Sequence, residues 1–166
     1  MSRSTLPIAI DYPAPEQIGA DRLADAVAAF TRFGAPSIVI DFGTAVTFDV
    51  VGAPGRYLGG VIAPGMMSMT ENLAKRTALL PRIDLAEPDS AIGRSTVEAM
   101  QIGAVIGYRG MIREILQAID HELEAPPYIV ATGGDAPLIA RGLSEIKSVV
   151  PELTLEGIRL IGEANR

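Results

Sequence analysis

Apolar residues follow two different repeats along the chain. Residues 37–41 and 45–51 are rich in β-branched and aromatic residues, and the turn GAPGR leads from them into a third run over 57–64. Such runs are typical of strands, and because short turns join them we expect a three-stranded meander. Shorter runs at 7–11 and 128–132 predict two further strands.

In other segments, apolar residues recur at the spacing of an α-helix. Leu23, Val27 and Phe30 recur at helical spacing and predict a helix over 19–33, which Gly34 ends. Further helices are predicted over 66–80, 95–123, 136–142 and 155–163, with a loop over 82–93. Ser95 and Glu98 have the spacing of a capping box. The pattern predicts an α/β fold, a mixed sheet with a three-stranded meander and packed helices, in a single domain over residues 1–166.

Three glycines interrupt the longest predicted helix. Gly103, Gly107 and Gly110 are four and three residues apart, so they lie on one face. Each costs about 1 kcal/mol relative to alanine in a helix interior, which calls for a compensating contact. A helix or sheet of the same chain would provide it, and so would the same helix of a second subunit.

Charge and composition limit the classes of partner. Twenty acidic residues against 14 basic ones give a net charge of -6, which disfavours nucleic acid but still permits a small anion at backbone N–H groups. The absence of cysteine excludes disulfides and thiolate chemistry and is typical of the cytosol. No secretory signal or membrane-length apolar run is evident, so we expect a cytoplasmic protein with no membrane partner.

The stretch DFGTA places a carboxylate at the end of a predicted strand. The N–H groups of Gly43 and Thr44 follow it directly and can converge on an anion, while Asp41 holds a cation beside that anion. The alternative is a tight turn in which Asp41 accepts N–H groups of its own loop.

The stretch GADR begins a predicted helix. Asp21 is either a helix cap or a general base within reach of a substrate hydroxyl. Arg22 either pairs with Asp25 one turn later or binds an anionic end of the substrate.

Two further segments can be interpreted either as ligand contacts or as purely structural features. If Ser95 caps its helix, the hydroxyl of Thr96 is left for a ligand, but either hydroxyl can be the cap. Gly133 and Gly134 follow a strand, where they either admit a ligand close to the backbone or only turn the chain.

In combination, these segments resemble a known family. The order GADR, DFGTA, YLGGVIAPG, RTALLP, IGRSTVEAMQIG and ATGGDA is similar to that of the type III pantothenate kinases, which belong to the actin-like ATPase, sugar kinase and Hsp70 superfamily. The similarity extends over about residues 8–161. It implies a ribonuclease H-like lobe, ATP-dependent phosphorylation of pantothenate to 4'-phosphopantothenate in coenzyme A biosynthesis, and a homodimer. Its cofactors would be ATP, magnesium and a monovalent cation, potassium or ammonium.

The resemblance also implies roles for individual residues. Gly19, Ala20, Asp21 and Arg22 correspond to the pantothenate-binding segment, with Asp21 as the base, and Thr96 corresponds to a second pantothenate contact. Asp41 corresponds to the ligand of the monovalent cation. The nucleotide contacts correspond to Gly43 and Thr44 at the phosphates and to Thr132, Gly133 and Gly134 beside the nucleoside.

One family feature has no counterpart here. The family begins with an Asp-x-Gly-Asn-Thr type strand and turn that binds the ATP phosphates, and nothing before Ile8 matches it. We therefore expect a C-terminal lobe without its N-terminal lobe, or with a separate N-terminal partner, and little activity of the chain alone. A non-catalytic binding or regulatory module of the same fold is the alternative, and a kinase for another small hydroxylated acid is a third.

Overall fold

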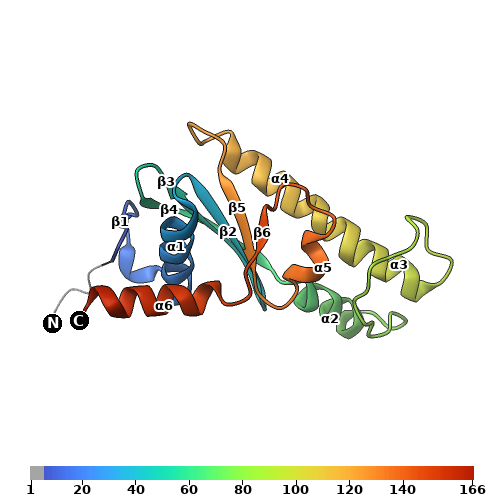
Figure 1. Ribbon diagram of the computed structural model, residues 1–166. Coiled ribbons are helices and arrows are strands. Elements are labelled where there is room, and N and C mark those ends of the chain that lie inside the picture. Colours follow the sequence, from blue (N-terminus) through green and yellow to red (C-terminus); the bar gives the residue numbers. More distant parts are fainter. Residues whose placement is uncertain (1–5) are drawn as a thin grey trace.

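A six-stranded mixed sheet forms the centre of the protein. The computed structural model describes residues 6–166, and its strands follow the order β1-β4-β3-β2-β5-β6 (Figure 1). The strands are β1 (Ala9–Ile10), β2 (Ser37–Phe42), β3 (Ala45–Gly52), β4 (Arg56–Pro64), β5 (Tyr128–Thr132) and β6 (Ser148–Val149). The predicted meander is confirmed, because β3 pairs antiparallel with both β2 and β4. Three parallel pairs, β1 with β4, β2 with β5 and β5 with β6, make the sheet mixed.

Helices cover both faces of this sheet. They are α1 (Ala20–Phe33), α2 (Met66–Arg76), α3 (Thr96–Ile102), α4 (Tyr108–Asp120), α5 (Ala136–Ala140) and α6 (Leu153–Ala164), with a short 3₁₀ turn at Pro15–Gln17. Residues of α1 and α6 pack on one face, around Val39 of β2. Residues of α4 and α5 pack on the other, around Ile38, Ile40 and Phe42. The predicted fold class, an α/β sheet with packed helices, is confirmed.

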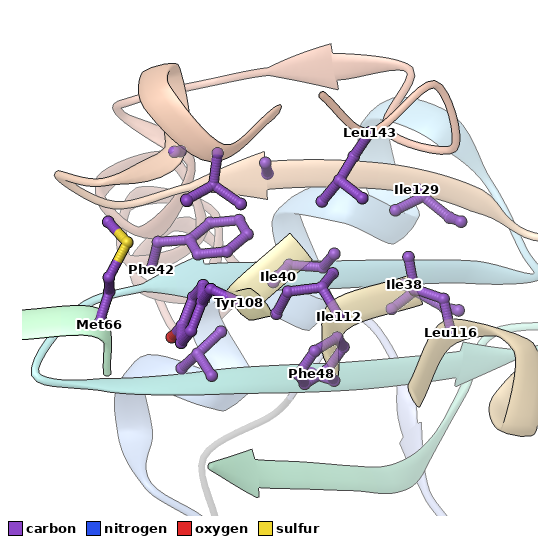
Figure 2. Packing of buried hydrophobic residues seen from close by; sticks show 14 of the residues in the cluster. Ile38, Ile40, Phe42, Phe48, Met66, Tyr108, Ile112, Leu116, Ile129 and Leu143 are labelled. Atoms are coloured by element: carbon purple, nitrogen blue, oxygen red, sulfur yellow. The ribbon is translucent and has the colours of Figure 1, made fainter. Parts of the chain in front are cut away.

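The larger hydrophobic cluster lies between α4 and the sheet. Figure 2 shows Tyr108, Ile112 and Leu116 of α4 against Ile38 and Phe48 of the central strands. The residues that alternate with these along β2 and β3, such as Val39 and Val51, are also buried, on the α1 face. Because β2 and β3 are buried on both faces, they read as nearly continuous apolar runs in the sequence.

The long predicted helix is divided by a wider turn. Between α3 and α4, residues Gly103–Gly107 form a π-helical turn, in which backbone hydrogen bonds span five residues instead of four. At the start, Ser95 accepts the N–H of Glu98 at 3.2 Å, as a capping box requires. The Glu98 carboxylate returns to the N–H of Arg94 at 2.6 Å. The predicted cap is therefore confirmed.

Several elements differ from the sequence-based expectation. Helix α2 ends at Arg76 instead of residue 80, because the Thr77 hydroxyl binds the Leu73 carbonyl and accepts the Leu80 N–H. Helix α5 ends at Ala140, two residues early. Strand β6 was not expected, because two residues carry no recognisable period.

No helix in residues 6–166 is long and apolar enough to cross a membrane. The expectation that the N-terminus lacks a secretory signal falls partly on residues 1–5, which lie outside the described residues.

Helices α1 and α6 approach each other through a glycine. Gly157 of α6 is buried against the backbone of Ala24 in α1, and a Cβ at this position would collide with the Ala24 carbonyl group. One turn away, the Thr154 hydroxyl donates to Asp25 Oδ1 at 2.7 Å. Close backbone approach is what a glycine permits, so Gly157 sets the separation of the two helices.

This packing predicts opposite effects for two glycines of α6. Gly157→Ala forces the helices apart, and we expect the free energy of unfolding to fall by about 1–3 kcal/mol. Gly162 has open space around it, so Gly162→Ala gains helix propensity and raises stability by up to about 1 kcal/mol. Urea denaturation of both variants measures this, and equal stabilities would contradict the assigned contact.

Candidate active site

The carboxyl ends of two parallel strands bring predicted site residues together. Asp41 of β2 is the register partner of Thr132 of β5, and Gly133 follows at once with a φ of 91°. A Cβ on Gly133 would collide with the Asp41 carboxylate and the Phe42 carbonyl, so only glycine fits there. Ligands of open α/β sheets bind at this edge. The Thr132 hydroxyl itself is buried and donates to the Pro151 carbonyl at 3.3 Å, so it faces inward.

The turn between β2 and β3 lies beside this edge. Gly43 and Thr44 are exposed, as the proposed phosphate contact needs. The Gly43 N–H, however, donates to the Ala45 carbonyl at 3.1 Å and is used within the turn. The Thr44 carbonyl accepts the Gly65 N–H at 3.0 Å and the Ser68 hydroxyl at 2.9 Å, which joins the turn to the start of α2.

Asp21 lies in the first turn of α1 and is exposed. Gly19 is the N-cap, Ala20 is the first helical residue, and the Asp21 carboxylate accepts the backbone N–H of Arg22 at 2.9 Å. Asp21 is therefore not the cap of this helix. Burial raises the pKa of Asp41, and the negative charge of Asp21 raises it further. The two carboxylates are therefore close enough to interact electrostatically.

Arg22 does not pair with Asp25, the alternative that its helical spacing allowed. Its Nε donates to Asp49 Oδ1 of β3 at 2.7 Å. Asp49 is fully buried and also accepts the hydroxyl of Tyr57 at 2.8 Å and that of Thr47 at 3.2 Å. Burial raises the pKa of Asp49 to about 6, against the opposing effect of Arg22. Sequence reasoning missed this cluster, although an aspartate inside the apolar run FDVV was a usable signal.

Asp25 is a second carboxylate that the sequence analysis left without a role. It is 1% exposed, and its described hydrogen bond comes from Thr154 of α6. Burial raises its pKa to about 7, and the charges of Asp41, Asp49 and Asp21 act in the same direction. The carboxylates of α1, β2 and β3 therefore form one electrostatic group, with Arg22 as the cation bound to it.

Thr96 lies in another part of the chain. It is the exposed first residue of α3, and Ser95 makes the cap bond, so the Thr96 hydroxyl is not needed for it. It borders a largely apolar cavity of about 420 Å³ that α2 and α3 line, and none of the lining residues comes from α1. Figure 1 shows α1 and α3 near opposite ends of the sheet. Within one chain, the structure does not bring Thr96 to Asp21.

The glycines of the long helix also lack a partner within the described residues. Gly103, Gly107 and Gly110 are exposed, and a Cβ at each would meet open space. Ile106 and Val97, on the same helical segment, leave 44% and 42% of their surface exposed. The contact that would compensate these glycines is therefore not made by this chain's own sheet or helices.

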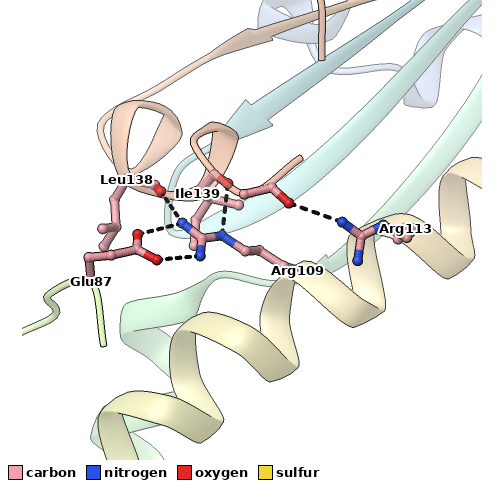
Figure 3. A network of polar contacts seen from close by, with 6 residues as sticks. Glu87, Arg109, Arg113, Leu138 and Ile139 are labelled. Carbon is pink, nitrogen blue, oxygen red and sulfur yellow. Dashed lines mark hydrogen bonds and ion pairs between the residues drawn. The ribbon is translucent and has the colours of Figure 1, made fainter. Parts of the chain in front are cut away.

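An arginine of α4 links this helix to the loop before Thr96 and to α5 (Figure 3). Arg109 of α4 is 8% exposed and donates to both carboxylate oxygens of Glu87 at 2.7 Å. It also donates to the carbonyls of Leu138 and Ile139, at 2.7 and 3.1 Å. Arg109 thus holds the loop before Thr96 and the end of α5, the helix that follows Gly133 and Gly134.

The described residues contain no group of three or more His, Cys, Asp or Glu side chains that would hold a metal ion. Asp41 is the predicted cation ligand, and its carboxylate is half-buried beside that of Asp21. A cation there would offset both causes of its raised pKa, so the site fits a single weakly held cation better than a closed metal centre.

A family model and the curated relatives of this chain point to the same family. The sequence model of the family described as Type III pantothenate kinase matches residues 1–118. A Type III pantothenate kinase of Akkermansia muciniphila is 58% identical over 162 residues, which cover 98% of this chain and 67% of that protein. A Type III pantothenate kinase of Methylacidiphilum infernorum is 49% identical, over 95% of this chain and 59% of that protein. The chain thus spans roughly 60% of the length of such curated relatives.

A solved structure supports the fold alone. A Campylobacter jejuni protein assigned to the Baf family of transcriptional activators superposes with a TM-score of 0.62 at 22% identity. The superposition covers 95% of this chain and 68% of that one.

The raised pKa of Asp25 predicts a pH-dependent stability. At about pH 4 and below, this carboxyl is protonated in the folded and the unfolded chain. As the pH rises toward 7, the unfolded chain releases the proton while the folded chain keeps it, so stability falls and then levels off. Asp25→Asn cannot ionise and still accepts from Thr154. Its stability relative to the unsubstituted chain should therefore rise between pH 4 and 8, by on the order of 3 kcal/mol.

Urea denaturation at several pH values measures this difference. Asp84→Asn removes the same charge from the exposed loop and serves as the control. If the two variants show the same pH profile, the assignment to burial of Asp25 is wrong.

Proposed function

Because the chain belongs to the type III pantothenate kinase family, we propose that it takes part in the ATP-dependent phosphorylation of pantothenate to 4'-phosphopantothenate, the first step toward coenzyme A. The observation that carries the proposal is that Asp41, in a segment that matches the family, lies at the carboxyl edge of the sheet beside Thr132, close enough to Asp21 for the charge of Asp21 to raise its pKa. The chain corresponds to only part of its relatives, so the proposed activity is that of the complete protein. We place the reaction in the cytoplasm.

Asp21 acts as the general base. Its carboxylate is exposed at the start of α1, so a substrate hydroxyl can reach it. The proton of the pantothenate hydroxyl passes to Asp21 as the hydroxyl oxygen bonds to the γ-phosphorus of ATP. The bond from that phosphorus to the bridging oxygen breaks, and its electrons leave with ADP. Phosphoryl transfer of this kind depends mainly on positioning and charge neutralisation.

The nucleotide lies across the carboxyl ends of β2 and β5. The exposed Thr44 contacts the phosphates, and Gly133 and Gly134 let the nucleoside approach the backbone. Because the Thr132 hydroxyl is turned inward, Thr132 contributes through its backbone. Asp41 would hold potassium or ammonium, which would neutralise charge near the phosphates. Magnesium would supply further neutralisation of the phosphate charge.

A second copy of the chain completes the pantothenate site. The cavity that Thr96 borders has no lining residue from α1, and the glycine face of α3 and α4 is open among the described residues. Two copies packed through this face around a twofold axis would cover the glycines and Ile106 and bring Thr96 of one protomer toward Asp21 of the other. A homodimer therefore explains both observations at once.

A non-catalytic binding module, the alternative function, is not favoured, because the curated relatives are kinases. A structural likeness to a transcriptional activator at 22% identity concerns the fold alone.

Asp21→Asn tests the catalytic role. The amide keeps the shape of the side chain but cannot take the proton, so turnover should fall about 10²–10⁴-fold while pantothenate affinity changes little. The assay follows 4'-phosphopantothenate formed with ATP, and calorimetry follows pantothenate binding. Asp120→Asn, on the exposed last turn of α4, is the charge-matched control. The assay uses the complete protein: undiminished turnover by its Asp21→Asn variant would remove the base from the mechanism, and a complete protein that binds no pantothenate would refute the function.

The dimer is tested by a substitution and by mixing. Ile106→Glu places a charge in the proposed interface, and light scattering should show a monomer, whereas Leu155→Glu on the exposed side of α6 should leave the dimer intact.

Arg22→Met and Thr96→Val chains should each bind pantothenate weakly, but mixed dimers regain one intact site. If mixing restores no binding, each site is built from a single chain.

A further inference from the structure

The carboxylate of Asp49 lies at the centre of a buried cluster on the α1 face of the sheet. It accepts three hydrogen bonds, from Arg22 Nε, Tyr57 Oη and Thr47 Oγ1, at 2.7, 2.8 and 3.2 Å. Its side chain has no exposed surface, and that of Arg22 is 12% exposed. A buried carboxylate is stable only when its oxygens are satisfied in this way.

Only Nε of the Arg22 guanidinium makes a hydrogen bond among the described residues. Nε carries the bond to Asp49, while Nη2 is buried and has no hydrogen-bond partner among the described residues. The guanidinium carbon lies 5.9 Å from the centre of the Tyr57 ring, which limits its rotation. A donor of this kind, buried and unused, is costly and calls for an acceptor.

A glycine lies next to Nη2. Gly60 of β4 is exposed, and a Cβ at this position would collide with the Phe48 carbonyl and lie 3.0 Å from Nη2, so a larger residue would crowd the guanidinium. Asp49 and Gly60 are register partners on neighbouring strands, so the strands place both of them beside Arg22. The backbone N–H of Arg22 is bound by Asp21, which puts the guanidinium and the proposed base on adjacent residues of one turn.

The bond to Asp49 of β3 restricts the Arg22 guanidinium, which its own helix α1 leaves free to rotate. Arginine side chains have large rotamer entropy, and a site that must hold a substrate within a fraction of an ångström needs that freedom removed before binding. The bond from Nε fixes the plane of the fork, and a planar fork presents its remaining donors in a set direction. The ion pair leaves those donors unused.

We propose that Asp49 is a positioning residue for the substrate site. It fixes the Arg22 guanidinium so that Nη1 remains for an oxygen acceptor of the substrate bound beside Asp21, with Tyr57 and Thr47 holding Asp49 in turn. This assignment rests on the proposed pantothenate function. Asp49 touches no reacting atom in this scheme and acts through Arg22 alone.

A double-substitution cycle tests this assignment on the full 166-residue chain. Pantothenate binding is measured by calorimetry for the unsubstituted chain, Asp49→Asn, Arg22→Met and the chain with both changes. We expect Asp49→Asn to weaken binding roughly tenfold, the scale of a charged hydrogen bond. In the Arg22→Met background, the same change should weaken it no further, because the group through which Asp49 acts is gone.

The outcomes separate the assignment from the function on which it rests. A loss that is equally large in the Arg22→Met background would mean a purely structural role and would overturn the proposal, as would unchanged binding by Asp49→Asn. An unsubstituted chain that binds no pantothenate would overturn both the proposal and the function.

A second variant keeps the test decisive if Asp49→Asn does not fold. Tyr57→Phe keeps the ring and removes only the hydroxyl that binds Asp49 Oδ1. It should weaken pantothenate binding about threefold, the scale of one neutral hydrogen bond, and this loss must also vanish in the Arg22→Met background. A threefold loss that persists there contradicts the positioning role.

Discussion

The pairing of β2 with both of its neighbours is the constraint on which the site depends. β2 runs antiparallel to β3 and parallel to β5, and this register puts Asp41 next to Thr132 at one edge of the sheet. The same register pairs Val39 with Asp49, which turns Asp49 toward α1. A shift of β2 by one residue would turn Asp41 to the opposite face, among the side chains of α4. The apolar burial of Ile38, Ile40 and Phe42 holds this register.

The electrostatics of the site follow from that geometry. Asp21, Asp25, Asp41 and Asp49 gather on one side of the sheet, and Arg22 is the cation bound among them. Burial raises the pKa of Asp25, Asp41 and Asp49, and that of Asp25 to about 7, so part of the negative charge of Asp25 is relieved by protonation near neutral pH. A kinase that must accommodate ATP phosphates next to such a group benefits from a cation at Asp41, which agrees with the cofactor proposed for this chain.

The helix formed by α3, the π-helical turn and α4 connects the two ends of the proposed site. Through Arg109 it holds Glu87 of the loop before Thr96 and the carbonyls that end α5. Its glycines, by contrast, face open space. The buried side of the helix is thus fixed within the chain, while its other side offers small residues and Ile106 to a second copy. π-helical turns occur often at functional sites, and this one lies at the proposed interface.

The sequence by itself determined the local elements of this protein. β-branched runs, helical spacing and the Ser95 and Glu98 cap depend on neighbouring residues, so the meander, α1 and the start of α3 were predictable. The juxtaposition of Asp21 and Asp41 came from family resemblance, because no local pattern links a helix start to a strand end. Only the tertiary structure decided that Arg22 pairs with Asp49 instead of Asp25, and that Asp25 binds Thr154 of α6. These bonds join residues 27 and 129 positions apart, and which distant groups meet is set by how the elements pack, not by the sequence around either partner.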